Sequence, residues 1–344
     1  MARKPARKSE GPKRDEIHID DFLDNFPLLR RLGPQALADL RRTATYRTLG
    51  PGELLFRQGE IANGMFLILH GAVEIATRIP GDDEIAVSRI GAGDLVGELS
   101  MLDGGGRSAT ARAAEPTGAM FISRARIRNL MSDAGPAAFA LMGRVRGQVA
   151  ARARTTYAAI FDRQAFDATI LRRAASRARI AKARQMPVEV AALISGLARL
   201  SALTAADARA LARSCEAVTA AKGALIADAG DNPDHLHIVL RGALRGALKR
   251  RRGGEQIHVH GPGEIVGLVP VIDGFPHPLR IEAAEDSLLL RMTRRDFETM
   301  SKGRTDLAIA VFDTVSRQLA RDVRRANRHL GRAQGLARFN EAAS

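Results

Sequence analysis

The sequence has little of what a secreted or membrane-embedded chain needs. Cys215 is the only cysteine, so no disulfide can form within the chain. No apolar run approaches the roughly 18 residues that cross a bilayer. The basic start of the chain, residues 1–14, is not followed by the apolar segment of a secretory signal. These absences predict a soluble, cytoplasmic protein in a reducing compartment.

Aromatic residues are also scarce. Trp is absent, and the aromatic residues together make up 4% of the chain, whereas hydrophobic residues make up 45%. The cores must therefore be built from Leu, Ile, Val and Ala. A length of 344 residues is enough for two domains of ordinary size.

Acidic residues are outnumbered, with 38 Asp and Glu against 53 Lys and Arg, which gives a net charge of +15. Such an excess suggests a nucleic-acid-binding protein. However, it is concentrated in residues 1–14, 163–184 and 317–342, and the rest of the chain is close to neutral. We interpret these segments as a tail and two helices with solvated basic faces. An acidic partner that binds them is the alternative.

The chain contains an internal repeat. GPGELLFRQGE at 50–60 matches KGALIADAGD at 222–231, and MFLILHGAV at 65–73 matches LHIVLRGAL at 236–244, both with an offset of 171 residues. The offset drops to 170 where GAGDLVGELSMLDGG begins at 91. One slipped residue in so long a register indicates a duplicated domain. We call the two repeats copy one and copy two.

Each copy alternates short β-prone apolar runs with Gly-containing turns, which is typical of antiparallel strands in a roll or barrel. Helical patterns lie on both sides of these runs. We therefore predict an α+β chain with two β-roll domains of the double-stranded β-helix or jelly-roll type, each flanked by helices. The predicted division is a disordered basic tail over 1–20, a first domain over 21–162 that ends in a long helix, a basic Ala/Arg-rich linker helix over 163–190 that ends near Pro187, a second domain over 191–335 that ends in an amphipathic helix, and a tail over 336–344.

The segment GDLVGELSMLDGGGRSATARA at 93–113 contains the residues from which a phosphate site can be built. The pattern predicts a strand that runs into one helical turn after Gly97, and glycines that then bring Arg107 and Ser108 back to it. A planar guanidinium grips phosphate oxygens in a fork, and backbone N–H groups at a helix start add to that grip. Arg107 is therefore the predicted phosphate fork, Ser108 a hydroxyl donor beside it, and Glu98 the acceptor for a ribose hydroxyl.

This segment resembles the phosphate-binding cassette of cyclic-nucleotide-binding domains, the family of the bacterial catabolite activator protein and of the regulatory subunits of cAMP-dependent protein kinase. The resemblance covers residues 26–160 well and residues 197–330 in scaffold. It implies cAMP as the ligand, with cGMP as the alternative. Alignment with the family's long helix also implies that Thr155 and Thr156 contact the purine. The predicted ligand-binding residues are Gly97, Glu98, Leu99, Ser100, Arg107, Ser108, Ala109, Thr110, Thr155 and Thr156.

The same positions are degenerate in copy two. There, Leu268 replaces Glu98, His277 replaces Arg107 and Pro278 replaces Ser108. Leucine cannot accept a hydrogen bond from a hydroxyl, and histidine is shorter than arginine and mostly neutral at pH 7. Copy two is therefore predicted to be a structural or interaction domain that binds no nucleotide.

Copy two also contains alternating histidines, His235 and His237 on one run and His258 and His260 on another. Imidazoles on neighbouring strands can bind one metal ion. No cysteine or suitable carboxylate completes such a set, so we interpret them as solvated strand histidines. We expect no metal and no other cofactor.

These patterns favour a non-enzymatic signalling protein that binds cAMP in copy one and passes the event through its helices to an unidentified effector protein. No Ser/His/Asp arrangement, P-loop or kinase signature is present. The alternative is a transcription regulator of the catabolite-activator type, or a nucleic-acid-binding protein that uses its basic helices. Sequence-specific DNA binding is not expected, because too few residues follow the last amphipathic helix to form a reading helix.

The last helix carries apolar residues at spacings of three and four. Such a row can pair with a second helix, so it predicts a homodimer, although it also suits packing on the chain's own rolls. The row consists of Ala308, Phe312, Val315, Leu319, Val323, Ala326 and Leu330.

Overall fold

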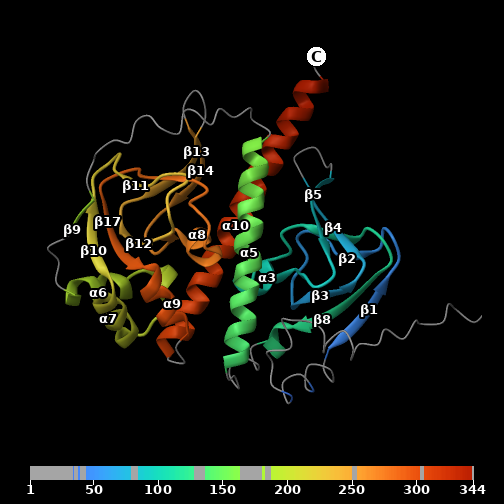
Figure 1. The fold of residues 1–344 in the computed structure, drawn as a ribbon, viewed down its shortest axis with the longest axis horizontal. Coiled ribbons are helices and arrows are strands. Elements are labelled where there is room, and N and C mark those ends of the chain that lie inside the picture. The colour runs from blue at the N-terminus through green and yellow to red at the C-terminus, as the bar shows by residue number, and fades with distance from the viewer. Residues whose placement is uncertain are drawn as a thin grey trace, which may run out of the picture.

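The computed structural model describes residues 34, 38, 44–78, 84–127, 136–162, 180–182, 187–249, 254–302 and 306–342. Two β-rolls lie on either side of two long helices, α5 (Pro136–Asp162) and α10 (Asp306–Ala342), as Figure 1 shows. The predicted α+β class, with two β-rolls flanked by helices, is confirmed. No helix among the described residues combines the length and the apolar character needed to span a membrane.

The roll of copy one is built from two four-stranded antiparallel sheets, with strand orders β1-β8-β3-β6 and β2-β7-β4-β5. The run GMFLILH forms β3, which is buried along its length except at His70. A short helix, α3 (Glu98–Asp103), separates β6 from β7. The strands are β1 (Thr45–Leu49), β2 (Leu54–Phe56), β3 (Gly64–His70), β4 (Ala72–Arg78), β5 (Glu84–Gly91), β6 (Leu95–Val96), β7 (Thr110–Ala113) and β8 (Thr117–Ser123).

The roll of copy two repeats this topology, with strand orders β15-β12-β17-β10-β9 and β11-β16-β13-β14. Its short helix α8 (Leu268–Asp273) takes the place of α3. The strands are β9 (Ile180–Lys182), β10 (Glu216–Ala220), β11 (Leu225–Ala227), β12 (His235–Arg241), β13 (Leu244–Lys249), β14 (Gly254–His260), β15 (Ile265–Val266), β16 (Arg280–Ala283) and β17 (Ser287–Thr293). The flanking helices are α6 (Pro187–Ser195), the 3-10 turn η2 (Ala198–Leu200), α7 (Ala205–Ser214) and α9 (Arg294–Lys302).

The linker predicted as one helix over 163–190 is wrong at residues 180–182 and in its predicted end near Pro187. Residues 180–182 form strand β9, which pairs with Val218–Ala220 at the edge of a copy-two sheet. Helix α6 begins at Pro187 instead of ending there, because a proline in the first turn lacks only an N–H that has no partner within the helix. The rest of this linker and the N-terminal tail over 1–20 lie outside the described residues. The C-terminal tail predicted over 336–344 is also wrong in its described part, since α10 continues to Ala342.

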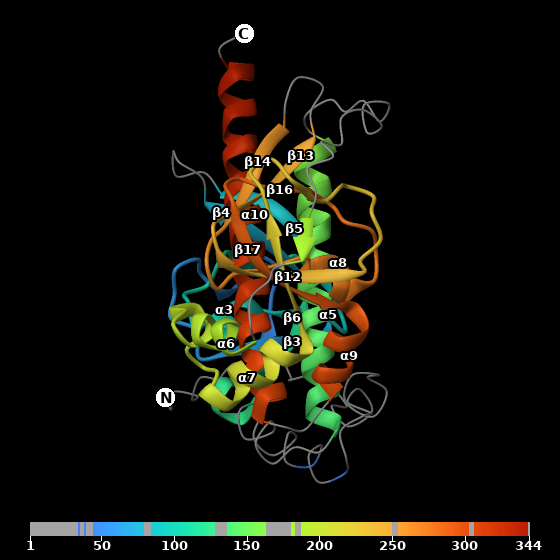
Figure 2. The same ribbon diagram turned by 90° about the vertical axis from the view of Figure 1, so that its left-hand side faces the viewer.

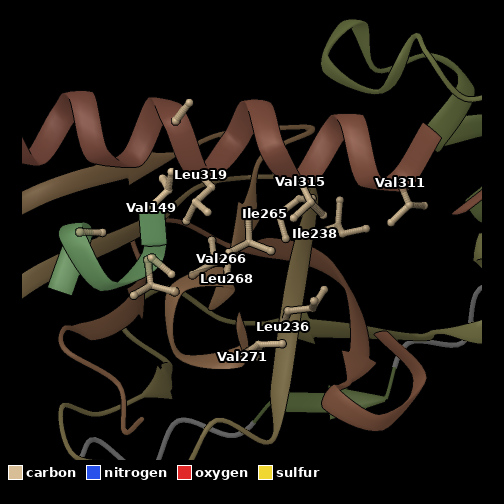
Figure 3. Close-up of a cluster of buried hydrophobic side chains, with 14 of the residues drawn as sticks. Val149, Leu236, Ile238, Ile265, Val266, Leu268, Val271, Val311, Val315 and Leu319 are labelled. Atoms are coloured by element: carbon tan, nitrogen blue, oxygen red, sulfur yellow. The ribbon is translucent and has the colours of Figure 1, made fainter. Parts of the chain in front are cut away.

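The two long helices pack against each other, and the view turned by 90° shows them running side by side (Figure 2). The guanidinium of Arg146 on α5 lies 4.1 Å from the ring centroid of Phe312 on α10. Figure 3 shows Val149 of α5 in one apolar cluster with Val315 and Leu319 of α10 and with strand residues of copy two.

The apolar row on α10 is therefore buried within the chain. The exposed fractions of its seven residues lie between 0% and 7%. This row motivated the predicted homodimer, and the structure shows it covered by α5 and by the rolls. The homodimer stays a prediction, but this surface no longer supports it.

An ion pair joins each long helix to the roll of the other copy. Arg154 of α5 binds both oxygens of Asp273 on α8, with N–O distances of 2.7 and 2.9 Å. Arg324 of α10 binds both oxygens of Asp103 on α3, with distances of 2.6 and 3.0 Å. The two arginines, like the two aspartates, are 170 residues apart. The sequence repeat is therefore also a repeat in contacts. The long helix that ends copy one binds the roll of copy two, and the long helix that ends copy two binds the roll of copy one.

Candidate functional site

A cavity of about 270 Å³ lies between the roll of copy one and the two long helices. Of the ten predicted ligand-binding residues, nine line it, and Thr110 does not. The Thr110 hydroxyl instead donates to Glu84 at 3.0 Å and accepts from the backbone N–H of Gln58 at 3.2 Å. The nine lining residues are Gly97, Glu98, Leu99, Ser100, Arg107, Ser108, Ala109, Thr155 and Thr156.

Two glycines set the path of the cassette backbone. Gly97 precedes α3 with a φ of +83°, and a Cβ there would lie 2.2 Å from Nη1 of Arg107. Only glycine fits that combination of positive φ and close approach. After α3, the Ser100 hydroxyl donates to the carbonyl of Gly106 at 2.9 Å, which ties the returning loop to the helix.

Arg107 is held rigidly with part of its guanidinium free. Its Nη1 donates to the carbonyls of Gly64 at 2.9 Å and Gly97 at 3.0 Å, and its guanidinium lies 4.1 Å from the Phe56 ring centroid. Burial lowers the pKa of Arg107, while the carboxylates of Glu60 and Glu98 raise it, and an arginine stays charged under such shifts. Its Nε and Nη2 have no protein partner among the described residues. A guanidinium held in this way can bind an anion without rearrangement.

Glu98, the first residue of α3, is 1% exposed. It forms an ion pair with Arg152 of α5, which also donates to the carbonyl of Leu95. A buried carboxylate needs such a counter-charge, and it retains lone pairs that can accept a hydroxyl hydrogen bond. Sequence reasoning missed Arg152, because nothing distinguishes it from the other arginines of this Ala/Arg-rich helix.

The two threonines of α5 line the cavity and make local hydrogen bonds. Thr155 donates to the carbonyl of Ala151 at 3.0 Å. The Thr156 hydroxyl lies 2.9 Å from the Arg152 carbonyl and 3.2 Å from Oδ1 of Asn327 on α10. Asn327 lines the same cavity. It was missed because it lies in copy two, 171 residues from Thr156.

At the matching place in copy two, the described residues that line the pocket around His277 include no arginine or lysine. Leu268, at the first position of α8, is 2% exposed and belongs to the apolar core in Figure 3. The His277 carbonyl accepts a hydrogen bond from the backbone N–H of Gly230 at 2.9 Å, just as the Arg107 carbonyl accepts one from Gly59. The alignment of the two copies in sequence therefore places His277 correctly opposite Arg107. Burial lowers the pKa of His277, and Arg154 lowers it further against the opposing effect of Asp231. A neutral imidazole brings no positive charge to a phosphate, and Pro278 has neither a hydroxyl nor a backbone N–H to donate.

The interpretation of the copy-two histidines as solvated strand residues is wrong for three of the four. His237, His258 and His260 are 7%, 3% and 3% exposed. The long helices cover β14, where the Tyr157 hydroxyl of α5 lies 2.7 Å from Nε2 of His258. In the described part of the chain, no group of three or more His, Cys, Asp and Glu residues is arranged to hold a metal ion.

We expect acid to destabilise copy two through His237. Burial lowers its pKa to about 3, with smaller contributions from His235, Arg291 and His277. Between pH 6.5 and pH 3 the unfolded chain binds a proton that the folded chain excludes, so the free energy of unfolding falls by about 1.4 kcal/mol per pH unit on acidification. The variant His237→Phe carries the side chain that copy one has at the matching position, Phe66. Between pH 6.5 and pH 5 its free energy of unfolding, measured with urea, should fall by about 2 kcal/mol less than that of the wild type. Equal pH slopes for the two proteins would contradict this.

Comparison with known proteins agrees with the repeat. The family model described as cyclic nucleotide-binding domain matches residues 46–134 and 217–303. A cyclic nucleotide-gated potassium channel of Rhizobium etli is 34% identical over 106 residues, which cover 29% of this chain and 28% of the channel. A cyclic AMP receptor protein of Thermus thermophilus is 37% identical over 92 residues, 26% of this chain and 42% of that protein.

A cAMP-dependent protein kinase regulatory subunit of Mycosarcoma maydis is 30% identical over 138 residues, 40% of this chain and 25% of the subunit. The match thus spans less than half the length of each of these three relatives. Among solved structures, the regulatory domain of Toxoplasma gondii PKA with cAMP aligns with 81% of this chain and 89% of that chain, at 16% identity and a TM-score of 0.30.

Proposed function

Because this chain belongs to the cyclic nucleotide-binding domain family, we propose that it is a non-enzymatic regulatory protein of the cytoplasm that binds cAMP in copy one. The ribose cyclic phosphate would lie against Arg107 and Ser108, with Glu98 accepting the 2′-hydroxyl. Thr155 and Thr156 would lie beside the purine. Copy two would bind no nucleotide and would take part in passing the signal to an effector protein.

One observation carries this proposal. A buried arginine and a buried carboxylate, nine residues apart in sequence, line one cavity of about 270 Å³ together with two α5 hydroxyls. That set supplies a cationic group for the phosphate, an acceptor for the sugar and polar groups for the base. A phosphodiester in such a site receives charge-assisted hydrogen bonds, which are about twice as strong as neutral ones.

Helix α5 is the natural route from the site to copy two. Its Arg152 pairs with the ribose acceptor Glu98, and its Arg154, two residues on, pairs with Asp273 of copy two. A ligand that competes with Arg152 for Glu98 therefore changes the forces on the helix that touches copy two. The effector would bind copy two or the basic residues of α10. Binding to α10 would require an acidic partner.

We expect calorimetry of the whole chain to show one cAMP site per chain and moderately weaker binding of cGMP. The single site follows from the loss of the carboxylate and the guanidinium at Leu268 and His277. The preference for cAMP follows from Ser108 beside the arginine and from the hydroxyl pair on α5. Titration with both nucleotides reports stoichiometry and affinity together.

Two outcomes would contradict the proposal. Two equivalents of cAMP per chain would mean that copy two binds nucleotide despite its neutral site. Equal or tighter binding of cGMP in direct competition would mean that the base is read differently from the way proposed.

A further inference from the structure

The cavity of copy one is closed on one side by copy two. Val323, Asn327 and Leu330 of α10 line it together with the cassette and α5. These three residues follow one face of the helix at spacings of four and three. Val323 and Leu330 are 2% and 3% exposed, so they pack as fixed walls, and Asn327 between them is the polar group that faces the cavity.

The α10 segment is fastened beside the predicted phosphate position. Arg324 binds both oxygens of Asp103 at 2.6 and 3.0 Å, and its Nη2 lies 3.4 Å from the Ser100 hydroxyl. The side chains of Arg324 and Asp103 are 17% and 11% exposed. Because Ser100 and Asp103 belong to α3, the helix that also carries Glu98, the position of α10 is coupled to the cassette itself.

The repeat shows what this arrangement does to each copy. Asn327 corresponds to Tyr157 on α5, and Ser88 on β5 corresponds to His258 on β14, both at an offset of 170. In copy two, the Tyr157 hydroxyl lies 2.7 Å from Nε2 of His258, and both side chains are buried at 3% exposure. In copy one, the smaller Asn327 and Ser88 both line the open cavity. In copy two this space is filled by two bulky side chains. In copy one the two side chains at the same positions are small and leave it open.

We propose that residues 323–330 of α10, which we call the lid, complete the ligand site of copy one, and that Asn327 reads the base. This inference rests on the proposed function. A carboxamide presents an acceptor and a donor side by side, which matches the N6 amine and the N7 of adenine. At this N7 edge guanine presents two acceptors, N7 and O6, and therefore pairs only with the carboxamide donor. The Oδ1 of Asn327, which lies 3.2 Å from the Thr156 hydroxyl, keeps a second lone pair for the adenine amine.

The test compares two substitutions of Asn327 in the whole chain by calorimetry with cAMP and with cGMP. Asn327→Tyr introduces the side chain that fills copy two, and it should lower the affinity for both nucleotides at least about a hundredfold. Asn327→Leu keeps the size but removes both hydrogen-bonding groups. It should lower the affinity for cAMP by about tenfold and leave cGMP within about threefold, so the preference for cAMP falls.

Arg317→Tyr is the matched control, because Arg317 lies on the same helix, is 54% exposed and pairs with Asp313 of α10. It should bind both nucleotides as the wild type does. If the wild type and Arg317→Tyr bind cAMP but both Asn327 variants bind it equally well, the lid inference is overturned and the proposed function stands. If the wild type binds neither nucleotide, the proposed function fails, and the lid with it. Should Asn327→Tyr fail to fold, the cAMP-to-cGMP ratio of Asn327→Leu decides alone.

Discussion

Replacement of Arg107 by alanine is expected to lower the affinity of the chain for cAMP by about a hundredfold to ten-thousandfold. Two charge-assisted hydrogen bonds to the phosphate would be lost, each contributing about 1.5–3 kcal/mol. The structure supports this because Nη1 of Arg107 is anchored on two backbone carbonyls, so that Nε and Nη2 remain available for two hydrogen bonds to a phosphate. Calorimetry with cAMP measures the loss, and retained tight binding would show that the phosphate lies elsewhere.

His277→Ala provides the control, since His277 takes the place of Arg107 in copy two. It should leave the affinity and the stoichiometry unchanged. Arg107→Lys separates charge from geometry, because lysine keeps the charge but has no planar fork. We expect it to bind with an affinity between those of the wild type and Arg107→Ala. Thermal unfolding of the two Arg107 variants shows whether loss of the contacts to Gly64 and Gly97 destabilises the fold.

The largest expected effect on stability is that of Glu264→Gln in copy two. Glu264 is 1% exposed and binds Arg325 of α10 through both oxygens, at 2.7 and 3.1 Å, with Arg199 at 3.3 Å. Glutamine removes the carboxylate charge that faces both arginines, and breaking a buried pair costs about 3–5 kcal/mol. Asp322 stays 3.6 Å from Arg325 and compensates part of its charge. Because the side chain of Arg325 is 23% exposed, we expect a loss near the lower end, about 3 kcal/mol in urea unfolding.

The pH dependence of this loss identifies its cause. Burial raises the pKa of Glu264, but the contact with His260, the hydrogen bonds from Arg325 and the charge of Arg325 outweigh it, so the pKa lies well below the usual 4.5. The pair therefore stabilises the folded chain above pH 4.5, and its contribution is lost as the pH falls below that value. The difference between wild type and Glu264→Gln should shrink in acid.

Glu298→Gln is the control for this experiment. Glu298 also pairs with an arginine in copy two, Arg294, at 2.8 Å, but the two side chains are 44% and 38% exposed. An exposed pair contributes about 0–1 kcal/mol, so this variant should unfold almost as the wild type does. A loss as large as that of Glu264→Gln would contradict the role assigned to burial.

The sequence by itself predicted the features that depend on short stretches of backbone. Arg107 returns to Glu98 through a glycine-rich turn of a few residues, and Gly97 adopts the positive φ that its place in the motif requires. The duplication and its register also came from sequence, since the offset places His277 where the structure has it. The strands followed from short apolar, β-prone runs that are bounded by glycine-containing turns.

Only the tertiary structure decided which side chains complete the site and which surfaces are covered. Asn327 and Arg324 reach copy one from the far end of the chain, Arg152 pairs with Glu98 across 54 residues, and β9 joins a sheet of copy two. The apolar row of α10 could have met a second chain or its own rolls, and its pattern is the same in both cases. Such choices depend on how the two rolls and two long helices pack together. That packing is set by shape and burial over segments some 170 residues apart, and no local pattern in the sequence encodes it.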